Sequence, residues 1–386
     1  MTRAAATREG VPLGLYVHWP YCARICPYCD FNVVRDRGRG AQKAALVEAV
    51  LADMTAHAAL TGPRRLVSIF FGGGTPSLMD PADVARVIAA ARDLWTADAD
   101  LEVSLEANPT DAESARFAAL AEAGVNRLSL GVQSLDDAAL AFLGRNHDAA
   151  SARRAVDIAG AAFSRLSVDL IYALPDQDLG AWARELAEVA AMGAEHVSPY
   201  QLTIEPGVPF HRRVARGTLV PVGPDRGADF YETTQTILEA AGFEAYEVSN
   251  HARGVAARSR HNLIYWRGQD YVGVGPGAHG RLTVAGERVA TVAPDAIEVY
   301  LARVRRMGIG SEPEPLDRRE AAIERLLMGL RTVEGVAVAD FAPLAIPAQR
   351  WAALEDLVRS GDGRLVATAA GRPVLDRVIA ELIADR

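Results

Sequence analysis

Apolar and β-branched residues occur along the first half of the chain in short runs, and the segments between these runs carry apolar residues at helical spacing. Six runs have the length and composition of buried strands, and they lie near residues 15–19, 66–71, 101–105, 127–131, 166–171 and 196–201. Strands that alternate with helices favour parallel β/α units. The pattern therefore predicts an α/β fold in which six units form an incomplete (β/α)6 parallel barrel.

Capping signals mark the beginnings of several intervening helices. Asp80 precedes Pro81, which is the order expected for an N-cap residue and the first residue of a helix. Thr110 and Glu113 have the spacing of a capping box, and Asp178 precedes another amphipathic segment. The sequence predicts that a helix begins at each of these three places.

The pattern changes after residue 245, where proline and glycine clusters become more frequent. Residues 1–245 are expected to form the barrel, and residues 246–310 a connecting segment. Residues 311–386 begin with a linker-like run and are expected to form a small C-terminal domain.

The C-terminal domain is expected to be a winged-helix-like α+β domain, because its pattern gives helix, helix, wing and helix. The first two helices are expected over 317–332 and 349–360, and the wing over 363–371. Such domains often bind DNA, but from Ser311 onward the chain has 13 acidic and 10 basic side chains and no lysine. Because contacts to phosphates need a basic face, packing or contact with a partner protein is the expected role.

Composition and charge narrow the class of protein. The chain has 386 residues, of which 50% are hydrophobic and 23% charged, as in soluble globular proteins. Its formal net charge of -8 argues against general attraction to nucleic acid or anionic lipid. The sequence shows neither a secretion signal nor an apolar stretch long enough to span a bilayer. A cytoplasmic protein without a transmembrane segment is expected, and peripheral contact with a membrane stays open.

All three cysteines of the chain lie on one short segment directly after the first predicted strand. Cys22, Cys26 and Cys29 have the spacing C-x3-C-x2-C. Thiolates are preferred ligands of iron–sulfur clusters, and three on one loop can hold three irons of a 4Fe–4S cluster, which leaves the fourth iron for an exchangeable ligand. Two alternatives stay open: a structural zinc site completed by His18, and a redox dithiol formed by two of the cysteines. With every thiol on this loop, no disulfide framework is available, which agrees with a reducing compartment.

Unusual residues also follow the later strands, at the end where parallel β/α barrels carry functional groups. Residues 72–76, Gly-Gly-Gly-Thr-Pro, allow close approach of the backbone to a ligand, although such a run alone is usually a turn. Glu106 ends an apolar run, where a carboxylate needs a partner: a ligand hydroxyl or ammonium group, or a salt bridge with Arg127 or Arg145. Two further polar residues occupy corresponding positions, Gln133 and Asp169.

The cysteine spacing resembles the signature of the radical S-adenosylmethionine (SAM) superfamily. The likeness covers nearly the whole chain, since residues 16–31, 70–77, 130–134 and 168–175 resemble segments of the oxygen-independent coproporphyrinogen III oxidase superfamily. The resemblance implies a 4Fe–4S cluster on the three cysteines, with SAM bound to the open iron and split to a 5′-deoxyadenosyl radical. It implies SAM contacts at Tyr16, Tyr28, Gly73, Gly74, Thr75, Glu106, Gln133, Arg145 and Asp169, and less directly at Gln201 and His279. In the oxidases some of these positions bind a second SAM molecule, and whether this chain does so stays open.

Within this superfamily, the H-N-x-x-Y-W motif that begins at His261 resembles the mark of a heme-chaperone branch. Neutral imidazole is a common axial ligand of heme iron, so His261 is the candidate heme ligand. Tyr265 and Trp266 offer flat apolar surface for a porphyrin, and Arg258 and Arg260 are candidates to pair with its propionates. The alternative is an ordinary loop packed against the core.

Two departures from the oxidases favour the chaperone. The oxidases have another cysteine just past the third ligand, whereas Cys29 is followed by Asp30, and only fifteen residues precede Tyr16 where the oxidases have a longer amino-terminal arm. The sequence predicts a heme chaperone that binds heme, a 4Fe–4S cluster and exchangeable SAM, and transfers heme to acceptor proteins. The alternatives are an oxygen-independent coproporphyrinogen III oxidase, which decarboxylates propionate side chains, and a radical SAM enzyme for another tetrapyrrole. Whether the chain is an enzyme stays open, and coproporphyrinogen oxidase activity is not expected.

Overall fold

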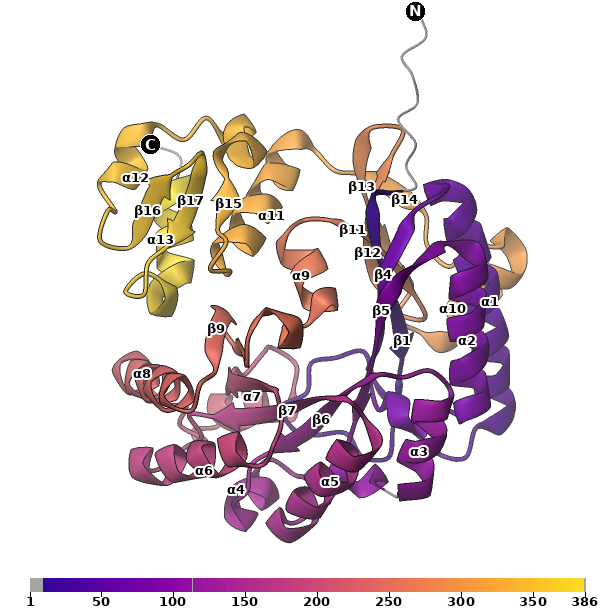
Figure 1. The fold of residues 1–386 in the computed structure, drawn as a ribbon, viewed down its shortest axis with the longest axis horizontal. Helices are drawn as coiled ribbons and strands as arrows, with labels where there is room; N and C mark the ends of the chain where they lie inside the picture. The colour runs from indigo at the N-terminus through magenta and orange to yellow at the C-terminus, as the bar shows by residue number, and fades with distance from the viewer. Residues whose placement is uncertain (1–9, 113, 385–386) are drawn as a thin grey trace, which may run out of the picture.

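The fold is built on one curved sheet with helices on its outer side (Figure 1). The computed structural model describes residues 10–112 and 114–384, and in these residues the sheet has twelve strands. The six predicted strands are present and pair with one another in parallel: β1 (Pro12–Trp19), β4 (Arg65–Gly73), β5 (Thr96–Ala107), β6 (Arg127–Gln133), β7 (Arg165–Tyr172) and β8 (His196–Gln201). The sheet keeps two edges instead of closing, so the predicted α/β class and incomplete barrel are confirmed.

Helices between the strands bury one apolar face against the sheet. They are α1 (Gly40–Thr61), α2 (Pro81–Leu94), α3 (Ser114–Glu122), α4 (Asp137–Phe142), α5 (Ala149–Ala162), α6 (Leu179–Ala191), α7 (Pro209–Ala215) and α8 (Pro224–Ala240). The buried residues of α2 show the helical spacing, since Val84, Val87, Ile88 and Ala91 face inward. The predicted caps at Asp80 and Asp178 are confirmed, because both side chains accept a backbone N–H of the first turn.

The helix predicted from Thr110 begins later than expected. A short 3-10 helix, Pro109–Asp111, comes first, and its capping box joins Asn108 to Asp111. α3 then starts at Ser114, and the predicted partner Glu113 lies outside the described residues. Pro109 explains the difference, because proline holds the preceding residue in an extended conformation and fixes the first turn at its own position.

Helix α1 is the one described helix whose length and apolar composition match a membrane span, so the prediction that no such stretch exists was wrong. The same test is passed by core helices of soluble proteins, and α1 packs against α2 and the sheet. Its buried face includes Asp53 and His57, whose side chains are 3.4 Å apart. His57 is fully buried, and this burial lowers its pKa to about 4.

Residues after the barrel add strands to both edges of the sheet. At one edge lie β9 (Glu244–Glu247) and β10 (Asn250–Ala252), and β10 pairs with β8. At the other edge β11 (Asp270–Val274) pairs in parallel with β1, and it is followed by β12 (His279–Val284), β13 (Glu287–Val292), α10 (Ile297–Met307) and β14 (Pro313–Pro315). Between β10 and β11 the chain crosses the open side of the barrel through α9 (Arg260–Trp266) (Figure 1).

The C-terminal residues form a small unit with a separate apolar core. Its elements are α11 (Arg318–Leu330), β15 (Val336–Ala337), α12 (Ala348–Ala352), β16 (Val358–Gly361), β17 (Arg364–Ala367) and α13 (Leu375–Ile383). The predicted helix over 349–360 was wrong after residue 352, because residues 353–357 form turns and β16 begins at Val358. Asp362 and Gly363 both have positive φ and form the turn of a hairpin between β16 and β17, so the wing begins earlier than expected.

Candidate functional site

A cavity of about 830 Å³ occupies the inside of the incomplete barrel. Its walls come from the inner faces of β1 and β4 to β8, from the cysteine loop and from α9, and Met328 of α11 closes one side. The size lies within the range of small-molecule sites. The three cysteines and all eleven residues predicted to contact SAM line this cavity, Gln201 and His279 included, and so does His261.

The cysteine loop is held against the carboxyl ends of β1 and β4 by backbone hydrogen bonds. Gly74 N–H donates to the carbonyl of Trp19 at 2.7 Å, and Thr75 N–H donates to that of Tyr21 at 2.9 Å. Two short strands, β2 (Tyr21–Cys22) and β3 (Val34–Arg35), pair and close the loop at its base. All three cysteines of this loop line the cavity.

The thiols suit a cluster better than a single ion. Cys22 is buried and Cys26 and Cys29 are half-buried, and burial raises the pKa of Cys22 and brings that of Cys29 to about 11. Among the described residues, no three side chains of the metal-binding types lie close enough to hold one metal ion. A single zinc ion needs all its ligand atoms within about 2.3 Å, whereas in a 4Fe–4S cluster each thiolate binds a different iron, so wider spacing is acceptable.

His18, the expected fourth ligand of a zinc site, is already engaged. Its Nδ1 lies 2.9 Å from the hydroxyl of Tyr16, and its Nε2 lies 2.8 Å from the carbonyl oxygen of Asn32. The carbonyl can only accept, so Nε2 donates and Nδ1 accepts the tyrosine proton. His18 therefore joins β1 to the end of the cysteine loop and does not support the zinc alternative.

The glycine run is required by close packing as well as by any ligand. A Cβ on Gly73, which has a φ of +105°, would lie 2.5 Å from the His18 ring. A Cβ on Gly74 would lie 2.7 Å from the carbonyl oxygen of Tyr21. The run is thus more than a generic turn, because it lets β4 end directly against the cysteine loop.

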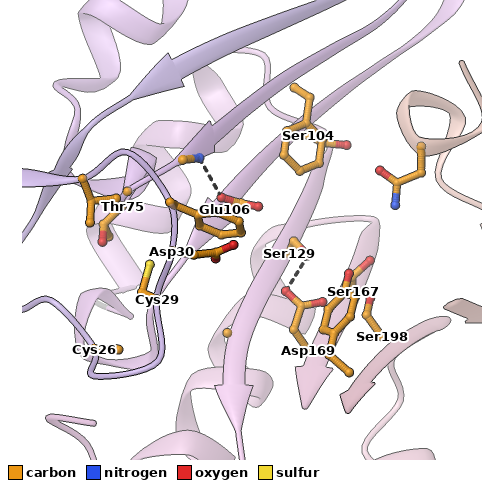
Figure 2. A pocket seen from close by; sticks show the side chains of 18 of the residues that line it. Cys26, Cys29, Asp30, Thr75, Ser104, Glu106, Ser129, Ser167, Asp169 and Ser198 are labelled. Carbon is orange, nitrogen blue, oxygen red and sulfur yellow. Dashed lines mark hydrogen bonds between the residues drawn. The ribbon is translucent and has the colours of Figure 1, made fainter. Parts of the chain in front are cut away.

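Two carboxyl groups lie deep in the cavity. Glu106, on β5, accepts the N–H of Gly73 at 3.1 Å, and Asp169, on β7, accepts the hydroxyl of Ser129 at 2.9 Å (Figure 2). Burial, with the nearby negative charge of Asp169, raises the pKa of Glu106 to about 8, and burial raises that of Asp169 to about 6. Oδ1 of Asp169 has no partner among the described residues. A cationic group with N–H donors would relieve the cost of both carboxylates.

Neither arginine proposed as a salt-bridge partner of Glu106 pairs with it. Arg127 lies 3.7 Å from Glu102 and donates to the hydroxyl of Ser167. Arg145 donates to Sγ of Cys26 at 3.3 Å and to the carbonyl of Gly131 at 2.8 Å, and it also contacts the side chain of Asn108. Arg145 therefore places a positive charge beside one of the cysteines.

A row of serines on the inner face was missed by sequence reasoning. Figure 2 shows Ser104, Ser129, Ser167 and Ser198, which come from β5, β6, β7 and β8. Each serine lies two residues before another residue that lines the cavity. Because alternate residues of a strand face the same side, this spacing near the ends of four successive strands could have identified the serines from the sequence. Gln133 ends β6 with a φ of +69°, a strained conformation for this residue type, and also lines the cavity.

His261 lies away from the rim, where α9 covers the first halves of β1 and β4. Its Nδ1 is 2.9 Å from the hydroxyl of Ser68, its Nε2 is hydrogen-bonded to the hydroxyl of Tyr265, and its ring stacks on Phe70 at 5.0 Å. Burial lowers the pKa of His261 to about 3, so the ring is neutral. Its backbone N–H donates to Glu102 at 3.1 Å. The motif therefore forms an inner wall of the cavity.

The arginines expected to meet heme propionates are occupied elsewhere. Arg258 pairs with Glu244 at 3.3 Å, and Arg260 pairs with Asp100. Neither arginine lines the cavity, whereas Tyr265 and Trp266 do. The structure thus brings together the cluster residues, the SAM residues and the aromatic part of the motif, and leaves out the two arginines.

The fold and the cysteine loop define a radical SAM protein, and comparison with known proteins agrees. Residues 16–187 match the model of the Radical SAM superfamily. The solved structure of coproporphyrinogen III oxidase (HemN) from Escherichia coli superposes with a TM-score of 0.79 at 22% identity, covering 98% of this chain and 92% of that one. At this identity the similarity establishes the fold.

Proteins related in sequence identify the family within the radical SAM superfamily. The mitochondrial radical S-adenosyl methionine domain-containing protein 1 of Bos taurus is 44% identical over 331 residues, which are 83% of this chain and 74% of that protein. Heme chaperone HemW of Escherichia coli K12 is 39% identical over 281 residues, which are 72% of each chain. The chain belongs to the HemW family of radical SAM proteins.

The residues present fit the cofactors that this family implies. Cys22, Cys26 and Cys29 would hold the cluster, and Glu106 and Asp169 would face the cationic part of SAM. When bound, the cluster supplies one electron at a time, and SAM supplies a sulfonium that such an electron can cleave. The chain supplies the buried carboxyls, the row of serine hydroxyls and the arginine beside Cys26.

Proposed function

We propose that this protein is a heme chaperone, which binds heme within the barrel, carries a 4Fe–4S cluster with exchangeable SAM, and delivers heme to acceptor proteins. The observation that carries the proposal is the continuous cavity from the cysteine loop to the α9 motif. Aromatic rings from several elements line it, including Phe70, Trp266 and Tyr271. Such a lining suits a flat macrocycle. The relatives named HemW support the same reading.

The proposed axial ligand is His261, and the structure sets a condition on it. Nε2 must leave Tyr265 before it can bind iron, because Nδ1 is held by Ser68. The ring is neutral, as an iron ligand has to be, since burial lowers its pKa to about 3. Ligation by His261 therefore involves a rotation of Tyr265 or of the imidazole.

The rival function is coproporphyrinogen III decarboxylation. The absence of a cysteine directly after Cys29 supports the chaperone over the oxidase, since Asp30 follows instead. The test is anaerobic: the cluster is reconstituted, SAM, a reductant and coproporphyrinogen III are added, and protoporphyrinogen IX is measured. We expect no turnover above a control without SAM. Steady product formation would overturn the proposal.

A heme titration forms the second half of the test. We expect the purified protein to bind heme at a fixed stoichiometry, with a Soret band distinct from that of free heme. Heme transfer is then measured by mixing the loaded protein with an apo-cytochrome and following the acceptor spectrum. Weak, unsaturable heme binding would contradict the chaperone even if oxidase activity were absent.

A soluble protein follows from this proposal. The composition and the packed position of α1 support it. Cytoplasm is the proposed location, and the relatives named radical S-adenosyl methionine domain-containing protein 1 are described as mitochondrial. Heme is the proposed small-molecule partner, and no nucleic-acid partner is proposed.

A further inference from the structure

Four of the eight histidines of the chain line the central cavity, and their rings differ in hydrogen bonding. His18, His196 and His261 are each hydrogen-bonded at both ring nitrogens. The fourth is His279, at the start of β12. His279 is exposed, and its ring has no hydrogen-bond or ion-pair partner among the described residues. In the part of the chain that the structure describes, His279 therefore supplies the one free imidazole in the wall of this cavity.

Close packing fixes the backbone of His279. Gly273, on β11, pairs with Tyr16 on β1. A Cβ on Gly273 would lie 2.0 Å from the carbonyl oxygen of His279, so the backbone of His279 occupies the place where a side chain at residue 273 would begin. On its other side His279 pairs with Val292 on β13. The backbone that carries the free imidazole is therefore held on two sides.

The segment that carries His279 is also tied to the end of the cysteine loop. The side chain of Asn32 donates to the carbonyl of Pro276 at 3.0 Å, and its carbonyl oxygen lies 2.8 Å from Nε2 of His18. Burial lowers the pKa of His18, and the charge of His279 contributes to the same shift. The ring of Tyr16, which accompanies His18 on β1, lies 6.3 Å from that of His261. Tyr16 thus lies between the two histidines that line this part of the cavity from β12 and from α9.

The surroundings of His279 decide what kind of metal it could bind. Among the described residues, no three side chains of the metal-binding types lie close enough to hold a bare metal ion. A metal bound by His279 therefore has to bring most of its ligands with it. An iron porphyrin does so, because the macrocycle fills the equatorial positions and leaves the axial positions to the protein. Tyr271 and Trp266, which line the same cavity, offer flat aromatic surface for such a ligand.

We propose that His279 is an axial ligand of the heme iron, in addition to His261. This inference rests on the proposed heme binding. A ring nitrogen of His279 donates its electron pair to the iron, and no hydrogen bond within the protein has to break for this bond to form. His261, in contrast, can bind only after its hydrogen bond with Tyr265 is broken. Two imidazole ligands give a six-coordinate, low-spin heme.

The test compares His279→Ala with His211→Ala, a control at another exposed histidine, which does not line the cavity. Heme is titrated anaerobically into the reconstituted proteins, whose oxidised cluster gives no paramagnetic signal, so the resonance spectrum reports the spin state of the heme. We expect low-spin heme in the wild type and in His211→Ala. His279→Ala should lose the low-spin signal and bind heme at least about tenfold more weakly. An unchanged spectrum and affinity in His279→Ala would overturn the inference.

Added imidazole gives a readout that a purely structural role of His279 would not change. It should restore the low-spin spectrum of His279→Ala, because the free ligand fills the space left by the side chain, and it should leave the wild type unchanged. SAM affinity is measured on the same proteins, since the family resemblance also implies a SAM contact at His279. Weaker heme binding with unchanged SAM affinity supports the inference. Weaker SAM binding with unchanged heme binding, or loss of both without rescue by imidazole, opposes it.

A second measurement uses the wild-type chain and does not depend on a variant that folds. Diethyl pyrocarbonate, which acylates free imidazoles, is applied with and without heme, and the modified peptides are identified by mass spectrometry. Heme should protect His279 and leave His211 reactive. Metal-free protoporphyrin IX should protect His279 less, since it lacks the iron. Equal protection by the two porphyrins, or none by heme, would show that the ring does not bind iron.

The outcomes separate this inference from the chaperone proposal. If the wild type binds heme at a fixed stoichiometry and His279→Ala keeps its spectrum and affinity, the inference alone fails. If the wild type binds no heme, the chaperone proposal fails and the inference fails with it. Heme binding in the wild type that is weakened in His279→Ala and restored by imidazole supports both.

Discussion

Tyr265 holds the side chain of His261 in place from one turn further along α9, through a hydrogen bond between its hydroxyl and Nε2 of the imidazole. Ser68, on β4, holds the other ring nitrogen at 2.9 Å. The imidazole is therefore hydrogen-bonded at both nitrogens, and a heme iron that binds it, as we propose, would have to displace Tyr265.

The competition gives the first prediction. Tyr265→Phe removes the competing hydrogen bond, which is worth about 1 kcal/mol, so heme affinity should rise about fivefold if His261 binds iron. His261→Ala should lower heme affinity at least about tenfold, since a ligand bond is lost. His211→Ala is the control, because His211 is exposed and does not line the cavity. Soret titrations measure all three, and an unchanged affinity in His261→Ala would remove this residue from the heme site.

Glu106 gives a prediction about pH. Because its pKa is raised to about 8, the carboxyl is mostly protonated at pH 7, and a cationic ligand must ionise it on binding. SAM affinity should therefore increase between about pH 6 and 8, with release of a proton that calorimetry in two buffers detects. Glu106→Gln should weaken SAM binding and flatten the pH dependence. A wild-type affinity that is constant over this range would contradict the assignment.

The same substitution should change the stability of the ligand-free protein. A carboxyl whose folded pKa is raised reduces stability as pH rises from its usual pKa near 4.5 toward 8, because the unfolded chain ionises first. Glutamine can still accept the N–H of Gly73 and carries no charge. Glu106→Gln should therefore melt at a higher temperature than the wild type at pH 8, and at a similar temperature at pH 4.5.

Arg145 gives a prediction about the cluster. Its guanidinium donates to Sγ of Cys26 at 3.3 Å. A positive charge near a sulfur ligand and a hydrogen bond to it both stabilise the reduced cluster. Arg145→Met removes both of these interactions. We expect a more negative reduction potential in Arg145→Met and a smaller change in Arg145→Lys, as measured by titration with paramagnetic resonance. Equal potentials in all three proteins would show that this contact does not tune the cluster.

Two glycine substitutions test the packing of the cysteine loop. Gly74→Ala places a Cβ 2.7 Å from the carbonyl oxygen of Tyr21, where neither backbone can easily move. We expect a loss of about 2 kcal/mol or more of stability and a reduced iron content. Gly160→Ala on α5 meets nothing within 4 Å and should stabilise by about 0.5–1 kcal/mol. Denaturant unfolding with iron analysis separates the two outcomes.

The apolar runs, the helical spacing between them and the helix-capping residues predicted the barrel, because buried parallel strands are continuous apolar runs. The six strands were placed within a few residues, and β8 has the predicted bounds. The strands β9 to β14, which extend the two sides of the barrel sheet, were not predicted, because β10 and β11 are short and owe their pairing to the existing strands β8 and β1. The wing was misplaced for a local reason, since the Asp362–Gly363 turn signal was read as the start of the ribbon instead of its tip.

The site was predictable where residue type alone fixes the chemistry. Three cysteines at fixed spacing and the carboxyls at strand ends line one cavity, as expected. Partners that depend on tertiary structure were not predictable. Arg145 reaches Cys26 across the barrel, and Arg260 reaches Asp100, although the sequence separation is large in both cases. The position of His261 deep in the cavity could not be predicted, because it depends on the path of α9 through the fold.

The crossing of the open side by α9 has a mechanical consequence. The chain leaves β10, which pairs with β8, and reaches β11, which pairs with β1, so α9 connects the two ends of the series of six barrel strands. The carbonyl oxygen of Ala257, just before α9, accepts a hydrogen bond from Arg127 at 3.0 Å, which anchors this segment to the interior of the barrel. Because His261 lies on α9, a ligand that displaces its imidazole should also displace α9. Binding and release of that ligand should therefore change the structure on both sides of the barrel, next to β8 and next to β1.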